Sequence, residues 1–373
     1  MDSDNGCRYM TVWVIILSVV FLIGSAAVVF IAAHIHRFQF LKKISEKHKI
    51  LAWIASFSFV LPVGLFALIN VTTMLVVIIH LAIGFGLCDL IFLIVGKIRK
   101  RNVGPTVCNV CAILLTVVYL GIGWIMAHHV FITHYTISTD KDLGGTLRIV
   151  QIADSHIGIT LDGDGFARQM ERVKQYNPDA VVITGDFVDD DTCYDDMLKA
   201  CRALGSLDAE YGVFFVFGNH DKGYYNSRDF TTAQLRQALQ ENGVVILEDE
   251  SVLVNDSFYI IGRKDRSDGS RQGMSALVDG LDSSKYSIVL DHQPNDYDSE
   301  AASGVDLVLS GHTHGGHLFP LALIGLLSGA NDMEYGIGER GETSFIVTSG
   351  ISGWAIPFKT GCFSEFVVID ITV

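Results

Sequence analysis

The stretch Gly311-His312-Thr313-His314-Gly315-Gly316 decides the fold, and it directly follows residues 305–310, whose apolar character predicts a buried strand. At the end of a strand, residues i and i+2 project to the same side, so His312 and His314 can face one point. Neutral imidazole is the commonest side-chain ligand of transition metals. The flanking glycines let the backbone bend sharply and pass close to whatever lies there. The stretch therefore predicts part of a metal site that needs partners from other strands.

Four other predicted strands also end in polar residues that could be ligands. In α/β proteins ligands bind at the carboxyl ends of the strands, so five such ends of the same polarity predict one shared site. Their side chains offer carboxylate, amide oxygen and imidazole without thiolate, a set that suits a hard or borderline divalent metal. Any single member could equally stabilise a turn. The strands and the residues that follow them are 147–153 with Asp154 and His156, 179–184 with Asp186, 212–217 with Asn219, His220 and Asp221, and 286–290 with His292.

The residues between these strands predict helices, which gives an α/β domain. Segments 164–176 and 195–204 are expected to be helical, and Asn177-Pro178 closes the first of them. A third helix opens with the capping residues Thr231 and Gln234. Two more strands are expected at 345–349 and 365–372. We therefore assign residues 147–373 to one globular domain.

The N-terminal part of the chain has a different chemistry. Four apolar runs cover residues 10–33, 50–69, 74–96 and 107–132, and each has about the 20 residues needed to cross roughly 30 Å of hydrocarbon. We expect residues 1–132 to form a four-helix transmembrane bundle and residues 133–146 to form a linker. Asp89 is the one acid or base in these runs. An intramembrane acid is functional by default, but we favour a carboxyl that reaches water or a neighbouring helix near a helix end.

Charge divides the chain at the same place. Residues 1–132 contain ten Lys/Arg against four Asp/Glu, whereas residues 133–373 contain 17 against 37. The acidic part argues against nucleic acid as a partner, because binding to the phosphate backbone needs clustered Lys/Arg. Positive loops mark the cytoplasmic side of a membrane, so we expect a multi-pass cell-membrane protein whose residues 133–373 are extracytoplasmic. The basic loops carry Arg37, Lys42, Lys43, Lys47 and Lys49, and Lys97, Arg99, Lys100 and Arg101.

The strand-end motifs occur in the order of a known family. They resemble the five blocks of the calcineurin-like metallophosphoesterase superfamily, and the resemblance covers about residues 147–373. His292-Gln293-Pro294 and the closing Gly315-Gly316 are similar to its membrane-anchored branch, which includes bacterial lipid-precursor pyrophosphatases and animal transmembrane metallophosphoesterases. The resemblance implies an αββα sandwich of two mixed sheets flanked by helices. The blocks are Asp154-x-His156, Gly185-Asp186, Gly218-Asn219-His220-Asp221, His292 and Gly311-His312-Thr313-His314.

The resemblance also implies a dinuclear centre for two divalent ions, and its ligand types do not choose among Mn, Fe and Zn. His220 would be the outer-sphere histidine that protonates the leaving oxygen or stabilises charge on the phosphoryl group. Asp221 would either hold the His220 ring by a hydrogen bond or only stabilise a turn. The implied ligands are Asp154, His156 and His314 for the first metal, Asn219, His292 and His312 for the second, and Asp186 as the bridge.

The activity implied is hydrolysis of a phosphodiester or pyrophosphate bond by metal-activated water. We expect a membrane-anchored phosphohydrolase whose partners are the lipid bilayer and a lipid-linked phosphate ester. The alternatives are a soluble phosphodiester substrate, with the helices only as a tether, and a catalytically inactive membrane receptor. Protein Ser/Thr phosphatases of this superfamily carry Arg-Gly after the second block. This chain has Asp190-Asp191 there instead, which disfavours phosphoprotein substrates.

Two features of the C-terminal part leave alternatives open. Residues 317–327 are apolar but too short to span a bilayer. They form either a buried hairpin of the core, the favoured interpretation, or an apolar lip beside the metals that dips into the outer leaflet or receives an acyl chain. Lys359 stands where this branch is expected to have arginine, so any contact with a substrate phosphate would be a point charge and not a bidentate pair.

Overall fold

The computed structural model describes residues 3–100, 103–224 and 227–373, without the side chains of residues 3–17. The chain divides into two compact units, Met1–Ile122 and Gly123–Val373, and the boundary falls within one long helix. The predicted basic residue Arg101 lies outside the described residues.

The first unit is built from helices, as the apolar runs predicted. Four segments are long and apolar enough to cross a membrane, and they are Ser18–His36, Lys49–Leu68, Val71–Arg99 and Pro105–His128. The fourth run ends earlier than expected, because the chain turns extended at Val130. The helices are α1 (Ser3–His36), α2 (Gln39–Lys47), α3 (Lys49–Ser58), the 3-10 helix η1 (Leu61–Leu68), α4 (Val71–Arg99) and α5 (Pro105–His128), the last of which continues into the second unit.

Asp89 contacts two neighbouring helices of this unit. Its Oδ2 atom accepts hydrogen bonds from Nε2 of His34 and Nη1 of Arg37, both at 2.9 Å, and Cys108 lies 3.3 Å from Oδ1. The Asp89 side chain is 40% exposed. These contacts agree with a carboxyl that reaches a neighbouring helix.

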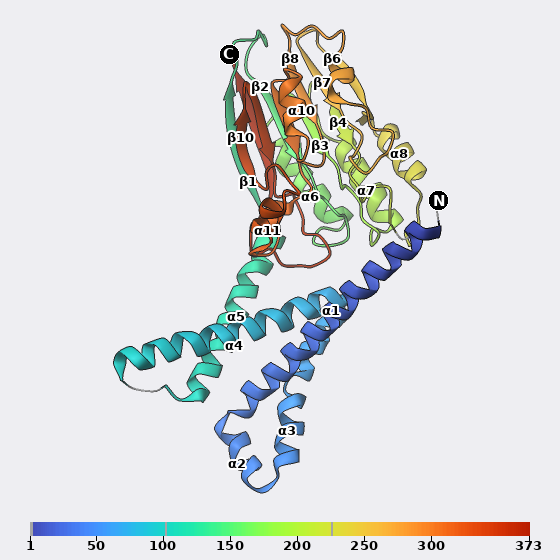
Figure 1. The fold of residues 1–373 in the computed structure, drawn as a ribbon. Coiled ribbons are helices and arrows are strands. Elements are labelled where there is room, and N and C mark those ends of the chain that lie inside the picture. The colour runs from blue at the N-terminus through green and yellow to red at the C-terminus, as the bar shows by residue number, and fades with distance from the viewer. Residues whose placement is uncertain (1–2, 101–102, 225–226) are drawn as a thin grey trace. The chain divides into compact units, whose positions relative to one another are not determined.

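The second unit contains the predicted sandwich of two mixed sheets (Figure 1). The first sheet has the order β1-β12-β2-β3-β4-β5 and the second the order β10-β11-β9-β8-β7-β6. Strands β2 to β5 run parallel, as do β7, β8, β9 and β11. The strands are β1 (Val130–Ser138), β2 (Leu147–Ile152), β3 (Ala180–Thr184), β4 (Val213–Val216), β5 (Val245–Ile246), β6 (Glu250–Val254), β7 (Phe258–Gly262), β8 (Tyr286–Leu290), β9 (Leu307–Ser310), β10 (Gly336–Arg340), β11 (Thr343–Val347) and β12 (Ser364–Thr372).

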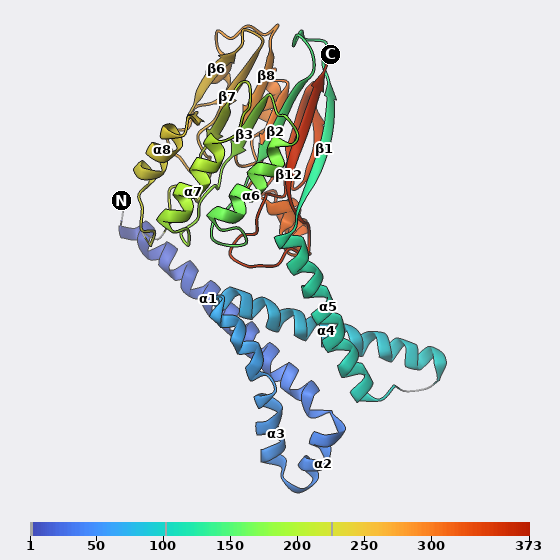
Figure 2. The same cartoon turned by 180° about the vertical axis from the view of Figure 1, so that it is seen from behind.

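Alternate residues of the strands form two kinds of core. One set points between the sheets, where Ile149 and Val182 of the first sheet join Ile288 and Leu309 of the second. The other set faces the helices that cover the outside of each sheet. Figure 2 shows α6, α7 and α8 over the first sheet, and Figure 1 shows α10 over the second. These helices are α6 (Gly163–Lys174), α7 (Tyr194–Gly205), α8 (Thr232–Glu241), α9 (Met274–Val278) and α10 (Tyr297–Ala302).

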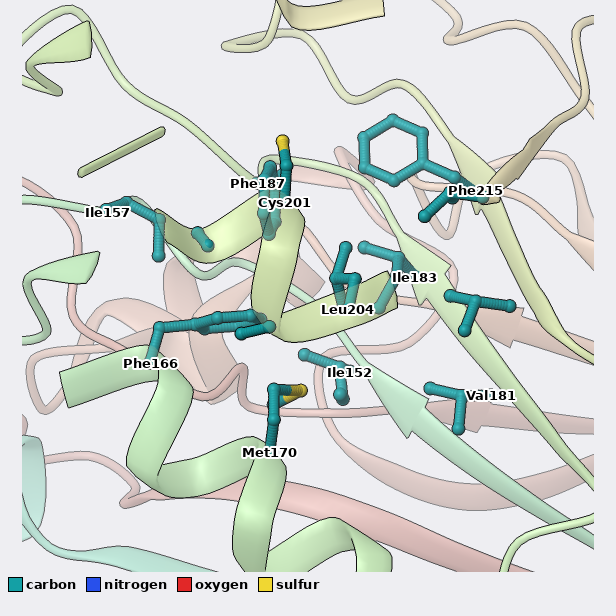
Figure 3. Close-up of a cluster of buried hydrophobic side chains, with 14 of the residues drawn as sticks. Ile152, Ile157, Phe166, Met170, Val181, Ile183, Phe187, Cys201, Leu204 and Phe215 are labelled. Carbon is teal, nitrogen blue, oxygen red and sulfur yellow. The ribbon is translucent and has the colours of Figure 1, made fainter. Parts of the chain in front are cut away.

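The helix-covered face of the first sheet is the larger outer core (Figure 3). Ile152, Val181 and Phe215 of the strands belong to the same buried cluster as Phe166 and Met170 of α6. All of them are fully buried, and burying one large apolar side chain stabilises a fold by about 1.5–3 kcal/mol. This packing holds the strands in register and therefore fixes where their carboxyl ends lie.

The predicted linker 133–146 is wrong for its first half. Val130–Ser138 forms strand β1, which pairs in parallel with β12 along its whole length, from Val130 opposite Ser364 to Ser138 opposite Thr372. Val130, Phe131 and Ile132 are β-branched or aromatic and suit an extended strand, although their apolar character extended the predicted helix over them. The β1 strand forms one edge of the first sheet and ties the end of α5 to the domain.

Candidate metal centre

Five strands bring the predicted site residues to one edge of the sandwich. β2, β3 and β4 lie side by side and parallel in the first sheet, as β8 and β9 do in the second. Their carboxyl ends therefore lie together, as ligand sites in α/β sheets require. Asp154 and His156 follow β2, Asp186 follows β3, Asn219, His220 and Asp221 follow β4, His292 follows β8, and His312 and His314 follow β9.

The backbone at these strand ends is strained. Five of the residues have φ between 34° and 71°, in the left-handed region that side chains other than glycine rarely adopt. Such a conformation costs on the order of 1–3 kcal/mol per residue and persists only when the surroundings impose it. Strain of this kind is typical of functional sites. The residues are Asp154, His156, Asp186, His312 and His314.

Two glycines allow the loops to approach each other closely. A Cβ atom at Gly218 would lie 2.2 Å from Oδ1 of Asp186, and one at Gly311 would lie 2.7 Å from Oδ2 of Asp154. A side chain at either position would displace a carboxylate of the site. The close approach of these loops therefore requires glycine at positions 218 and 311.

Asp154, His156 and His314 form the first group of ligand atoms, which all lie within 4.8 Å of one another. The Nε2 atoms of His156 and His314 are 3.2 Å apart, and Nε2 of His314 lies 4.0 Å from Oδ1 of Asp154. Burial raises the pKa of Asp154 to about 6. A buried carboxylate beside two converging imidazole nitrogens fits a divalent cation well, because the cation would compensate the buried charge.

Asp186, His292 and His312 form a second group of the same kind. Nε2 of His292 lies 3.1 Å from Oδ2 of Asp186 and 3.2 Å from Oδ1 of Asn219. Nδ1 of His292 is 2.8 Å from the carbonyl oxygen of Thr184, so it must be the protonated nitrogen that donates there. Nε2 is therefore the nitrogen that faces the cluster and would bind a metal.

Asp186 lies between the two groups. Its Oδ2 atom is 3.7 Å from Nε2 of His156 and 3.1 Å from Nε2 of His292. Its Oδ1 atom accepts the backbone N–H of His220 at 2.8 Å. Burial opposes ionisation of Asp186, but the charge and hydrogen bond of His292 hold its pKa below the usual range.

The two histidines after β9 are held neutral. Burial lowers the pKa of His312 to about 4, and the charge of His292 adds to this effect. Burial lowers the pKa of His314 well below its usual value, and the neighbouring His156 lowers it further. Neutral imidazole is the form that binds a metal. The glycine-flanked histidine motif therefore presents two rings in the form a metal site needs.

The prediction that Asp221 orients the His220 ring is wrong. Oδ1 of Asp221 accepts the backbone N–H groups of Phe187 and Val188 at 2.8 and 3.0 Å, and Oδ2 accepts that of Gly218 at 2.8 Å. Three main-chain donors thus occupy this buried carboxylate. The alternative, a carboxylate that stabilises turns, is the one the structure supports.

Asp189 is the residue that sequence reasoning missed. Its Oδ1 atom lies 3.2 Å from Nδ1 of His220, and its Oδ2 atom lies 2.9 Å from Nδ1 of His156. Burial opposes its ionisation, but the close contact with His156 and the hydrogen bond from His220 lower its pKa below the usual range. The sequence offered one indication, which is that Asp189 follows Asp186 by three residues on the same loop. The adjacent Asp190 and Asp191 made the whole acidic run resemble an exposed surface.

Lys359 does not face the cluster. It is fully buried, and its Nζ atom donates to the carbonyl oxygens of Ser349 and Gly350 at 2.6 and 3.2 Å. Gly350 in turn lies against Asp154, because a Cβ atom there would be 2.6 Å from Cβ of Asp154. Lys359 therefore holds the loop behind the first group of ligands.

A pocket of about 360 Å³ opens onto the cluster. Asp186, His220, His312 and His314 line one part of it. Another part is lined by residues beyond the histidine motif, including Leu321 and Gly325 of helix α11 (Leu321–Ser328). Residues 321–328 are all at least partly exposed, so the favoured prediction of a buried hairpin at 317–327 is wrong. The glycine-terminated apolar run forms a surface helix instead.

Comparison with known proteins identifies relatives of this domain. Residues 147–316 match the family model described as calcineurin-like phosphoesterase. An uncharacterized metallophosphoesterase of Aquifex aeolicus is 34% identical over 64% of this chain and 90% of its own length. A Danio rerio transmembrane protein with metallophosphoesterase domain is 30% identical over 60% of this chain, which spans about half (52%) of that relative. The crystal structure of a 5'-nucleotidase precursor from Thermus thermophilus is similar at 17% identity with a TM-score of 0.36, covering 61% of this chain and 54% of its own.

Proposed function

The chain belongs to the calcineurin-like phosphoesterase family of metal-dependent phosphoesterases, and we propose that it is a membrane-anchored phosphohydrolase with a dinuclear centre. The observation that carries the proposal is the place of Asp186, one oxygen of which lies 3.7 Å from Nε2 of His156 and 3.1 Å from Nε2 of His292. One carboxylate facing two groups of ligands is what a pair of cations about 3.5–4 Å apart requires.

In this proposal each group of residues holds one divalent ion. Asp154, His156 and His314 would hold the first ion and Asn219, His292 and His312 the second, and Asp186 would serve both. Mn, Fe and Zn all suit this set of donors. Two bound ions would supply an activated water and neutralise the phosphate oxygens that it attacks.

The chain's own residues supply orientation and a proton. His220 lines the pocket and is placed to protonate the leaving oxygen or to stabilise charge on the phosphoryl group. Burial opposes protonation of its ring, but the hydrogen bond to Asp189 raises the pKa of His220 above its usual value. Asp189 holds the His220 ring through Nδ1 and so directs Nε2 away from itself, toward the space where a leaving group would lie.

We propose a lipid-linked phosphodiester or pyrophosphate as the substrate. Four apolar helices precede the domain, and the pocket has an apolar part formed by α11. The basic loops favour an orientation in which the globular domain is extracytoplasmic. A reporter fused after Val373 that fluoresces only in the cytoplasm should then stay dark. A soluble phosphodiester, with the helices only as a tether, is the second candidate.

The test uses the purified full chain and bis(4-nitrophenyl) phosphate. Hydrolysis is expected with Mn²⁺, should be lost on chelation with EDTA and should return when Mn²⁺ is restored. No hydrolysis at saturating Mn²⁺ would support the inactive-receptor alternative and refute the proposal. A panel of lipid-linked and water-soluble phosphate esters, compared by kcat/KM, then separates the two substrate candidates.

A further inference from the structure

Helix α11 and the nearby residue Phe319 expose an unusual amount of apolar surface. Residues 318–331 contain no Asp, Glu, Lys or Arg. Contiguous exposed apolar surface is rare on soluble domains and marks a site of protein or membrane contact. The exposed side chains, called the apolar lip here, are Phe319 (63% exposed), Leu321 (48%), Leu323 (53%), Ile324 (57%), Leu326 (47%) and Leu327 (87%).

The apolar lip borders the pocket of the metal centre. Leu321 and Gly325 line the same pocket as His312 and His314. The inner side of α11 packs closely there, because a Cβ atom at Gly325 would lie 1.9 Å from Oε1 of Glu334. The lip is therefore fixed against the site, and its leucines lie on the surface of the domain.

The base of the lip is held by the loop that also holds the end of α5. The backbone N–H groups of Thr360 and Gly361 donate to the carbonyl oxygen of His317 at 2.9 and 3.0 Å, and Oγ1 of Thr360 accepts the N–H of Phe319 at 3.2 Å. The backbone N–H of Lys359 donates to the carbonyl oxygen of Gly123 in α5 at 2.9 Å. Three consecutive residues thus join the lip to the final part of a helix that is apolar enough to cross a membrane.

We propose that the apolar lip inserts into the bilayer interface beside the pocket. A helix that leaves a bilayer does so at the bilayer surface, and a neighbouring apolar helix without charge is stabilised when its apolar surface moves from water into that interface. The inference rests on the membrane anchoring of the proposed function and does not depend on the proposed hydrolysis. Insertion of the apolar lip would bring the pocket to the level of the lipid headgroups. A lipid-linked phosphate would then reach the metal centre without leaving the membrane.

The experiment places a tryptophan in the lip of the full chain. Leu327→Trp is reconstituted in phosphatidylcholine vesicles with and without brominated acyl chains, which quench tryptophan on contact. The parent protein, with its four tryptophans, gives the baseline. Leu253→Trp is the matched control, because Leu253 is also exposed (40%) but belongs to β6, which both views place apart from α11 (Figures 1 and 2).

The expected result is an additional loss of fluorescence for Leu327→Trp in brominated vesicles, and no additional loss for Leu253→Trp. Leu323→Trp is a second reporter in the lip if the first variant does not fold. Baseline quenching of both lip reporters would overturn the inference, because the lip would then lie in water, against a second copy of the chain, or be reserved for a substrate's acyl chain. Hydrolysis of bis(4-nitrophenyl) phosphate by the same proteins tests the proposed function separately.

Discussion

Two neighbouring segments of this chain, Gly311–Gly316 and α11, have opposite chemistry and opposite surroundings. The first is polar, mostly buried and strained, and its two histidines contact ligand-type residues that follow other strands. The second is apolar, regular and at least partly exposed along its whole length. The histidine rings of the polar segment contact residues from distant parts of the chain. The apolar side chains of α11 are largely not covered by other residues of the domain. The pocket between them is therefore lined by polar ligand-type residues in one part and by residues of α11 in another.

The largest effect is expected from Asp186→Asn. It removes the one charge shared by both groups of ligands, so hydrolysis should fall by on the order of a thousandfold or more and bound metal should be lost. Turnover of bis(4-nitrophenyl) phosphate and metal content by mass spectrometry measure this. Asp298→Asn, whose side chain is 95% exposed, is the control and should match the parent protein. Hydrolysis retained by Asp186→Asn would show that the polar segments do not form the proposed metal centre.

Asp189→Asn should reduce turnover by about 10- to 100-fold, the usual effect of removing a partner that orients a functional imidazole. The free energy of unfolding should change little by comparison, because the loop is held mainly by the carboxylate of Asp221. Turnover equal to that of the parent protein would show that His220 needs no orienting carboxylate.

Asp221→Asn should instead reduce stability. The new NH₂ group would face backbone N–H groups of Phe187, Val188 or Gly218, and one unsatisfied buried donor costs about 1–3 kcal/mol. Urea unfolding of the globular domain, followed by circular dichroism, measures the loss. The opposite pattern, with stability lost in Asp189→Asn and only turnover lost in Asp221→Asn, would restore the sequence-based assignment of Asp221.

The smallest effect is expected from the double variant Leu323→Ser, Leu326→Ser. Both side chains are about half exposed, so the free energy of unfolding should change by only about 0.5 kcal/mol and hydrolysis of the water-soluble ester should be unchanged. Leu309→Ser is the contrast, because Leu309 is fully buried between the sheets and its loss should cost about 2–5 kcal/mol. If the double variant unfolds, Leu323 and Leu326 contribute to the hydrophobic core, and the apolar lip is not a surface feature.

Local patterns were enough to predict the strands that carry the site, the first three helices between them and the four apolar helices. They work because apolar periodicity and capping residues report the local environment of each segment. The strand-end motifs also predicted which side chains converge, since parallel strands place their carboxyl ends together. Strands β1, β5, β6, β7 and β10 were not predicted; β5 has only two residues, and β6 and β10 are partly exposed segments with weak patterns.

The remaining questions were decided only by the tertiary structure. β1 is a strand because β12, more than two hundred residues away in sequence, pairs with it. Asp221 accepts hydrogen bonds from buried backbone N–H groups, and the carboxylate that contacts the His220 ring is that of Asp189. The run at 321–328 has the composition of a core segment, yet the sandwich leaves it outside. The sequence by itself determined which residues could bind metal, span lipid or form strands. Which residues contact each other depends on how distant segments pack together, and a local sequence pattern does not contain that information.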